Sequence, residues 1–257
     1  MKKKLSIVAL ALGLYATAAP AQAPFDIVGL RLGMTEQEAM AALQAHDSTL
    51  NITRVASYYS YSDGIETFQT EQFLGEIQAK RQNSQQVVPE FSLLFSPPPQ
   101  GGRLWAVTRR EQIAANPPSI EQYAETLEQK FGKPAAVSPG LYSMNWTQPD
   151  GKPTCLARDP QRPGFPTWRP KSDSGDLLFT LQAANQRNPN PPDYKTCGSH
   201  LFYILSTASD NVVSSFEAIM FDIGHQVTAS ELANQQVQAL EDQARKAREG
   251  KGQVPTL

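Results

Sequence analysis

Two stretches of the chain combine a helix-start signal with apolar positions at helical spacing. Thr35 lies three residues before Glu38, and Ser119 lies three residues before Gln122, so each pair is typical of a capping box. Gly132 marks a stop after the second stretch. We therefore predict two amphipathic helices, near residues 35–46 and 119–131. Their apolar faces carry Ala39, Met40 and Leu43 in the first, and Ile120, Tyr123, Ala124, Leu127 and Phe131 in the second.

Each predicted helix is followed by runs whose residues alternate between apolar and polar or stay apolar, as strands do. The order of helix followed by strands thus occurs twice, first over residues 24–115 and then over 116–225. It predicts an α+β fold built from two helix-then-antiparallel-sheet units in tandem, with the helices packed on one sheet face. The predicted strands are 50–61, 72–81, 91–95 and 103–113 in the first unit, and 141–146, 176–183, 200–207 and 214–223 in the second.

A third capping box, T-A-S-E, begins at Thr228 and predicts a C-terminal helix within residues 226–257. We expect the first half of this helix to dock and the charged remainder to fray, with a partner-binding helix as the alternative. Its narrow apolar stripe consists of Leu232, Ala233, Val237, Leu240 and Ala244.

The N-terminus has the pattern of a secretory signal peptide. Three lysines precede a short apolar run, and small residues follow it. We predict a signal peptide over residues 1–21, cut between 18 and 24; a buried N-terminal helix is the alternative. The segment has no cysteine for lipid attachment, and no other run has the length to cross a bilayer. We therefore expect a soluble periplasmic or secreted protein with no membrane span or lipid anchor.

The charge balance argues against polyanionic partners. Without the three lysines of the predicted signal peptide, 20 basic residues face 25 acidic ones, a net charge of about −5. Nucleic acid and anionic lipid are therefore not expected as the main partner.

The two cysteines, Cys155 and Cys197, predict one disulfide in an oxidising compartment. They lie in two long proline-rich loops, 149–175 and 185–199. The bridge would join both loops into one surface and contribute about 4 kcal/mol in the chain-entropy model. We predict a partner-binding role for that surface, although Phe165 and Trp168 could instead form a small core beneath it. The candidate partner-binding residues are Phe165, Trp168, Arg169 and Tyr194.

The chain contains no G-x-S-x-G, no P-loop and no G-x-G-x-x-G motif, so we predict no cofactor and no metal. The three histidines, His46, His200 and His225, lack the spacing of a metal site. Ser209-Asp210-Asn211 matches one β-lactamase motif, but no S-x-x-K accompanies it, so we interpret it as a turn.

The phrase GLRLGMTEQEA, residues 29–39, resembles the opening of the SmpA/OmlA-type outer-membrane assembly lipoproteins and is similar to the β-lactamase-inhibitor-protein fold. Residues 130–134, K-F-G-K-P, look like the end of the helix in the same unit. The resemblance implies a tandem protein-binding scaffold of the cell envelope with no catalytic residues to carry over. This chain departs from the lipoprotein pattern because it lacks the lipidated cysteine.

Three functional hypotheses follow. The first is a non-catalytic binding or structural module whose partner is another envelope protein, supported by aromatic and arginine side chains on the joined loops. The second is a hydrolase of an unrecognised type that gathers histidine and aspartate from distant positions. The third is a carrier of a small ligand, which requires an apolar cavity.

Overall fold

The computed structural model describes most of the chain after the N-terminal segment. The predicted signal peptide lies outside the described residues. These comprise residues 24–81, 90–148, 155–156, 168–171, 177, 181–183, 190–208 and 211–249.

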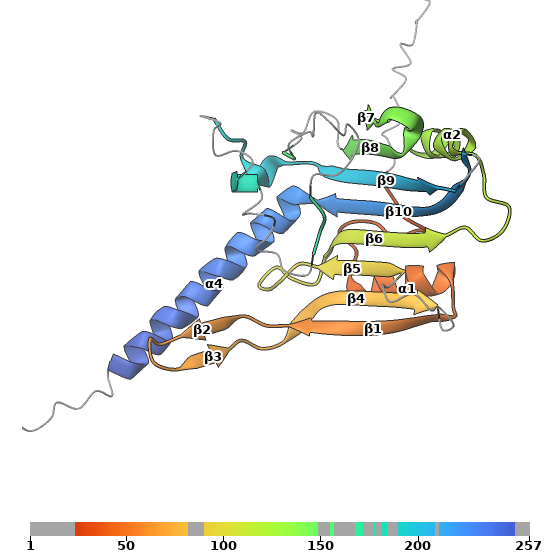
Figure 1. Ribbon diagram of the computed structural model, residues 1–257. Coiled ribbons are helices and arrows are strands. Elements are labelled where there is room, and N and C mark those ends of the chain that lie inside the picture. The colour runs from red at the N-terminus through yellow and green to blue at the C-terminus, as the bar shows by residue number, and fades with distance from the viewer. Residues whose placement is uncertain are drawn as a thin grey trace, which may run out of the picture.

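One antiparallel sheet of eight strands forms the body of the protein (Figure 1), in the order β1-β4-β5-β6-β10-β9-β8-β7. Its first half contains β1 (Leu50–Ser57), β4 (Phe73–Arg81), β5 (Phe91–Phe95) and β6 (Leu104–Gln112). Its second half contains β7 (Ala136–Val137), β8 (Ser143–Gln148), β9 (Ser199–Thr207) and β10 (Val213–Asp222).

The last strand of each half lies at the centre of the sheet, where β6 and β10 pair. Phe221 lies opposite Ala106 and Ser215 opposite Gln112 in this register. The two halves therefore share one continuous sheet. The antiparallel α+β class and the C-terminal helix that the sequence predicts are confirmed.

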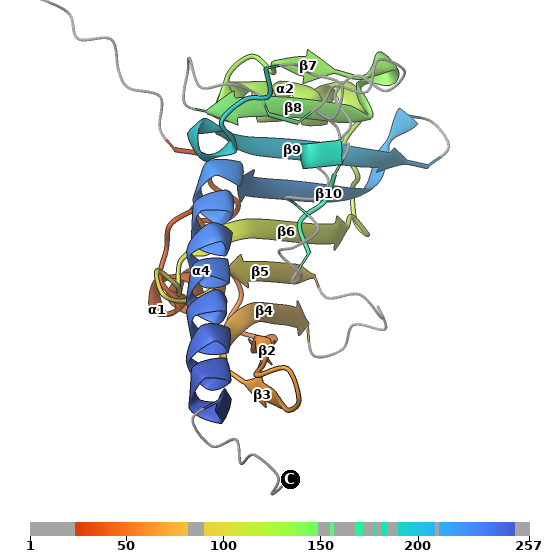
Figure 2. The ribbon, with the colours of Figure 1, turned by 90° about the vertical axis from the view of Figure 1, so that its left-hand side faces the viewer.

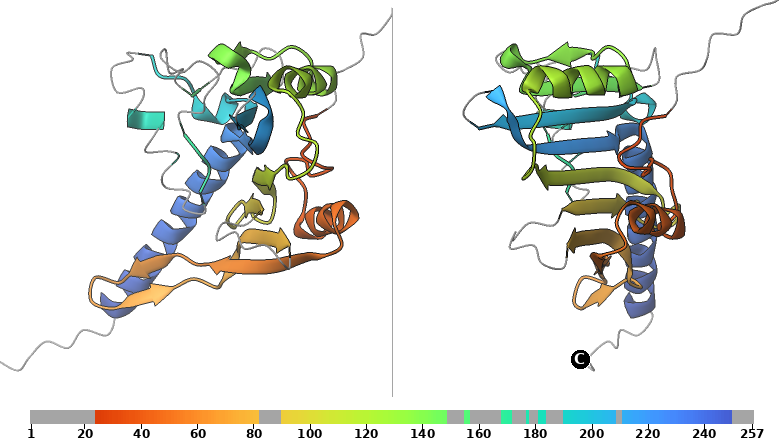
Figure 3. Two further views of the ribbon diagram at one scale, coloured as in Figure 1. Left: turned by 45° about the vertical axis from the view of Figure 1, so that its right-hand side comes forward. Right: turned by 90° about the vertical axis from the view of Figure 1, so that its right-hand side faces the viewer.

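The helices α1 (Glu36–His46) and α2 (Ile120–Phe131) cover one face of the sheet (Figure 3). Leu43 of α1 and Leu127 of α2 pack into the same buried cluster as Leu93 and Val107 of the central strands. Both helices begin where the sequence predicts. The side chains of Thr35 and Ser119 cap them, and both capping boxes are complete.

Helix α4 (Ile223–Glu249) lies across the opposite face (Figure 2). Its first turns pack on a second buried cluster, which includes Trp105, Phe202 and Phe221. Gly224 permits this approach, because a Cβ at that position would lie 2.5 Å from the backbone oxygen of Lys195 in the short helix η2 (Tyr194–Thr196).

The predicted start of this helix at Thr228 is wrong. Helix α4 begins five residues earlier, directly after β10, and Asp222 accepts a hydrogen bond from the backbone N–H of His225 at 2.9 Å. Thr228 is interior to the helix and donates to the backbone oxygen of Gly224 at 2.8 Å. The helix continues to Glu249, and residues 250–257 lie outside the described residues, so the expected fraying stays a prediction.

The strand predicted over residues 176–183 is also wrong. Leu177 and residues 181–183 are helical. Leu177 and Leu181 are four residues apart and both are fully buried against the α4 side of the sheet, as one face of a helix requires. A short apolar run does not distinguish a buried strand from a buried helix.

The predicted strand 50–61 is interrupted in the structure. It divides into β1 and β2 (Ser60–Ser62), and β2 pairs with β3 (Thr67–Gln69) in a small separate sheet. This hairpin extends beyond the main sheet and lies beside the far end of α4 (Figures 1 and 3).

No helix in the described ranges has the length and apolar character needed to cross a membrane.

Candidate functional site

Cys155 and Cys197 form the predicted disulfide, with their Cα atoms 5.8 Å apart. Both cysteines are buried and belong to the cluster on the α4 side of the sheet. The bridge therefore fastens the two loops to the core as well as to each other.

Among the described residues, the side chains around this bridge do not form an exposed aromatic patch. Trp168 is buried between Trp105 and Phe221, at ring-centroid distances of 6.3 and 5.4 Å. The hydroxyl of Tyr194 donates to the backbone oxygen of Leu181 at 2.9 Å. This geometry favours the small-core alternative for Trp168.

Arg169 is the most exposed of the described members of the predicted surface. Its side chain is half-exposed and forms an ion pair with Glu217, which also pairs with Arg110 at 2.7 Å. Phe165 lies outside the described residues. The partner-binding role of the four residues stays a prediction.

The three histidines lie in separate environments. His46 ends α1 and packs edge-on against Phe91, whereas His200 lies on the opposite sheet face, stacked on Phe202 and Phe221. Burial lowers the pKa of His200 to about 4, and neither ring nitrogen has a hydrogen-bond partner among the described residues. His225 lies in the first turn of α4, where burial also lowers its pKa. Within the described ranges, no cluster of three His, Cys, Asp or Glu residues could hold a metal ion.

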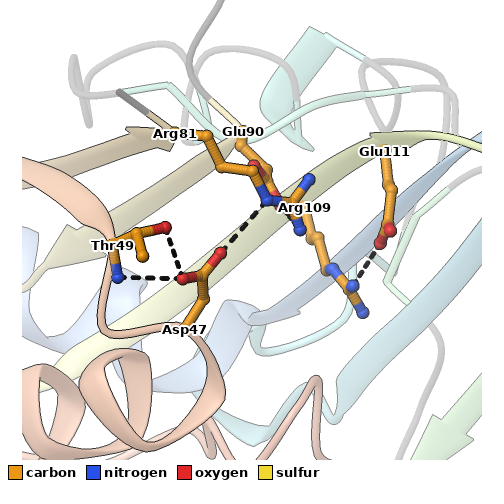
Figure 4. Close-up of polar contacts among 6 residues, drawn as sticks. All are labelled: Asp47, Thr49, Arg81, Glu90, Arg109 and Glu111. Carbon is orange, nitrogen blue, oxygen red and sulfur yellow. Dashed lines mark hydrogen bonds and ion pairs between the residues drawn. The ribbon is translucent and has the colours of Figure 1, made fainter. Parts of the chain in front are cut away.

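A chain of charged side chains joins the end of α1 to the ends of β4 and β5 (Figure 4). Asp47 accepts hydrogen bonds from the backbone N–H and the hydroxyl of Thr49, at 2.9 and 2.7 Å. Its second oxygen accepts from Arg81 at 3.1 Å. The bonds from Thr49, followed by Arg81, lower the pKa of Asp47 to about 2. Arg81 also reaches Glu90, at 3.2 Å.

Arg109 and Glu111 continue this chain along β6 and form an ion pair (Figure 4). The guanidinium of Arg109 lies over the rings of Phe91 and Phe216, at 5.6 and 5.2 Å. Burial, and then the charge of Glu111, raises the pKa of Glu90. Two guanidiniums pair with three carboxylates along this chain, which is the arrangement of a structural cluster that holds the helix end to the sheet.

The hairpin is built by a tight turn at residues 63–66. Asp63 accepts the backbone N–H groups of Ile65 and Glu66, both at 2.8 Å, and Gly64 supplies the positive φ of +97°. Across the two strands, Tyr61 and Phe68 stack at a centroid distance of 5.5 Å. The turn therefore presents Ile65 at its tip, 76% exposed.

Arg248 joins this turn to the last part of α4. Its Nε donates to the backbone oxygen of Asp63 at 3.0 Å, and the Asp63 carboxylate lies 3.8 Å away. Ala244 lies one helical turn earlier and faces the hairpin with Arg248. The helix and the hairpin therefore form two walls that are held together at one end.

A pocket of about 560 Å³ lies between these walls. We call it the hairpin pocket. Its lining combines an aromatic pair, three aliphatic side chains and three charged ones, a mixture typical of a binding site. The lining residues are Tyr61, Asp63, Ile65, Glu66, Phe68, Ala244, Ala247 and Arg248.

No residue of this site was predicted from the sequence. The signal that could have found the turn is D-G at 63–64 between two aromatic positions. The distant residue Arg248 carries no such signal, because its contact with Asp63 spans 185 positions.

No family model matches this chain, and neither do curated proteins or solved structures. The resemblance to SmpA/OmlA-type lipoproteins and to the β-lactamase-inhibitor-protein fold therefore stays an expectation drawn from residues 29–39.

Proposed function

We propose that this protein is a non-catalytic binding module of the cell envelope and that another envelope protein docks in the hairpin pocket. The observation that carries the proposal is the pocket itself. Aromatic and aliphatic side chains line it, and Ile65 extends from it into solvent. Tyrosine and arginine, both present in this lining, are among the side chains that dominate binding energies at protein interfaces.

The rigid support of the pocket favours this role. Strand β1 leads into the hairpin, and the first half of α4 is buried in the second core cluster. A partner would therefore meet preformed walls and would pay little to order them.

The proposed compartment is the periplasm or the extracellular space, after removal of the signal peptide proposed for residues 1–21. The Cys155–Cys197 disulfide supports this placement, because such bonds persist in oxidising environments. We also propose that the two halves are tandem copies of one unit. The symmetric strand order around the β6–β10 pair supports this relationship.

Photo-crosslinking tests the proposed function. A benzophenone amino acid at position 65 would lie at the mouth of the pocket, and the same group at Tyr142, also exposed, serves as the control. We expect a defined crosslinked protein in envelope extracts from position 65 and not from position 142. Equal labelling from both positions would contradict the proposal.

A small-ligand carrier is the second candidate. The volume of the hairpin pocket, about 560 Å³, lies in the range of sites for small molecules. Native mass spectrometry of the protein purified from its own envelope would detect a retained small molecule. Its loss when Ala247, which lines the pocket, is replaced by leucine would favour this function over protein binding.

A further inference from the structure

The charged side chains that line the hairpin pocket differ in whether they have partners within the protein. Asp63 is fully engaged, since it accepts two backbone N–H groups of the turn and faces Arg248. These interactions, with the bond from Glu66 N–H the largest, lower its pKa. Arg248 is engaged in turn with the backbone oxygen and carboxylate of Asp63. Both charges are therefore used to build the wall of the pocket.

Glu66 differs from this pair. Its backbone N–H and C=O serve the turn, with Asp63 and Ser62 as partners. Its carboxylate lines the pocket but has no hydrogen bond or ion pair with any described residue. The pocket thus offers a ligand one uncompensated negative charge.

Two further features of the pocket lining indicate which ligand would fit beside this charge. The stacked rings of Tyr61 and Phe68 lie beside Glu66, and aromatic faces attract cations as well as apolar groups. Ile65, Ala244 and Ala247 supply an aliphatic surface that excludes charge. A ligand that satisfies both features has a large apolar group next to a cation.

We propose that the hairpin pocket binds a segment of a partner protein in which a large apolar side chain lies next to lysine or arginine. This inference rests on the proposed function. The apolar side chain packs between the aromatic pair and the two alanines of α4. The basic side chain reaches the Glu66 carboxylate at the mouth. The net negative charge of the chain favours the approach of such a segment.

A charge-swap experiment tests this inference with defined probes. Two short fluorescein-labelled peptides share a central pair of leucines, which are flanked by lysines in one peptide and by glutamates in the other. Their binding is followed by fluorescence anisotropy at low and high salt. The variants are Glu66→Lys and a matched control, Glu125→Lys, which changes the net charge equally at an exposed position on α2.

We expect the wild-type protein to bind the lysine peptide more tightly by about threefold or more, as exposed ion pairs allow, with the difference shrinking in high salt. Glu66→Lys should reverse the preference, whereas Glu125→Lys should preserve it. Ala247→Leu, which narrows the pocket, should weaken binding of both peptides.

Three results would overturn the inference in distinguishable ways. Binding that is lost in Ala247→Leu but does not respond to Glu66→Lys would leave the pocket as a binding site and reject the basic partner. Concentration-dependent self-association that Ala247→Leu abolishes would identify a second copy of this chain as the occupant. No binding of either peptide would reject this ligand class, and the crosslinking from position 65 would then decide the proposed function by itself.

Discussion

The guanidinium of Arg248 donates a hydrogen bond to the backbone oxygen of Asp63 at 3.0 Å, across 185 positions of sequence. This contact brings the end of α4 against the turn of the β2–β3 hairpin and closes one end of the hairpin pocket. Because the sheet does not cover this part of the helix, this contact and the packing of α4 on β2 hold the two walls together.

Replacing Arg248 by alanine should release the hairpin from the helix. We expect faster amide hydrogen exchange in β2, β3 and the last turns of α4, with a loss of only about 1 kcal/mol in the free energy of unfolding, as for one hydrogen bond. Arg245→Ala removes an exposed arginine that pairs with Asp242, and it should leave the exchange of the hairpin unchanged. Equal exchange in both variants would contradict the proposed role of Arg248.

Trp168 and Arg169 are neighbours in sequence but should differ sharply in their effect on stability. Trp168→Ala removes a buried ring between Trp105 and Phe221, and we expect a loss of about 3–5 kcal/mol in urea unfolding. Arg169→Ala removes a half-exposed partner of Glu217 and should cost about 0.5 kcal/mol or less. Similar small effects at both positions would indicate that Trp168 is not a core residue.

His200 should make the protein less stable in mild acid. Its pKa is lowered from 6.5 to about 4 by burial, so the unfolded chain binds a proton between these pH values that the folded chain does not. Stability is therefore lost as the pH falls from about 6.5 towards 4. Urea unfolding at pH 7 and pH 5 measures this loss.

The variant His200→Phe isolates the contribution of this side chain. The phenyl ring can stack on Phe202 and Phe221 as the imidazole does, and it has no proton to gain. We expect a smaller loss of stability between the two pH values than in the wild type, since His46 and His225 titrate in both proteins. An unchanged difference would show that His200 is not held neutral by the fold.

Glu90 should be destabilising in its charged form. Its pKa is raised, mainly by burial, so the folded state disfavours the carboxylate and stability is lost as the pH rises through the folded pKa. In Glu90→Gln, Asp47 can still pair with Arg81, and Glu111 with Arg109. We expect the variant to match the wild type near pH 4 and to exceed its stability at pH 7.

Chemical denaturation across this pH range provides the measurement for Glu90. The groups that face this carboxylate, namely Asp47, Arg81, Arg109 and Glu111, remain in both proteins. A variant that is less stable than the wild type at pH 7 would mean that the ion pair with Arg81 outweighs the cost of burying Glu90.

The helix starts at Thr35 and Ser119 could be predicted from the sequence because a capping box is local chemistry, complete within four residues. Seven of the eight strands of the main sheet also lie where alternation predicts them, because that pattern is local too, whereas the two-residue strand β7 was not predicted. Thr228 shows the limit of this approach. The T-A-S-E motif is present, but β10 runs directly into the helix and Asp222 provides the earlier start, so tertiary packing overrides a good local signal.

The candidate site was beyond prediction because it joins distant segments. The turn at Asp63 and Gly64 has a local signal, yet the pocket exists only because α4 crosses the sheet and meets the hairpin. Trp168 illustrates a related difficulty. An aromatic side chain in a proline-rich loop can serve an interface or a small core, and only its neighbours Trp105 and Phe221 distinguish the two.

The central claim is tested most directly by isothermal titration. The partner recovered by crosslinking is titrated into each of two matched variants. Ala247→Leu narrows the hairpin pocket, and Ala239→Leu adds the same side chain at an exposed position on the same helix. If the pocket is the docking site, isothermal titration should give a loss of affinity of about tenfold or more, or about 1.4 kcal/mol, for Ala247→Leu and little change for Ala239→Leu. Equal affinities for both variants would contradict the claim that the partner docks between the hairpin and α4.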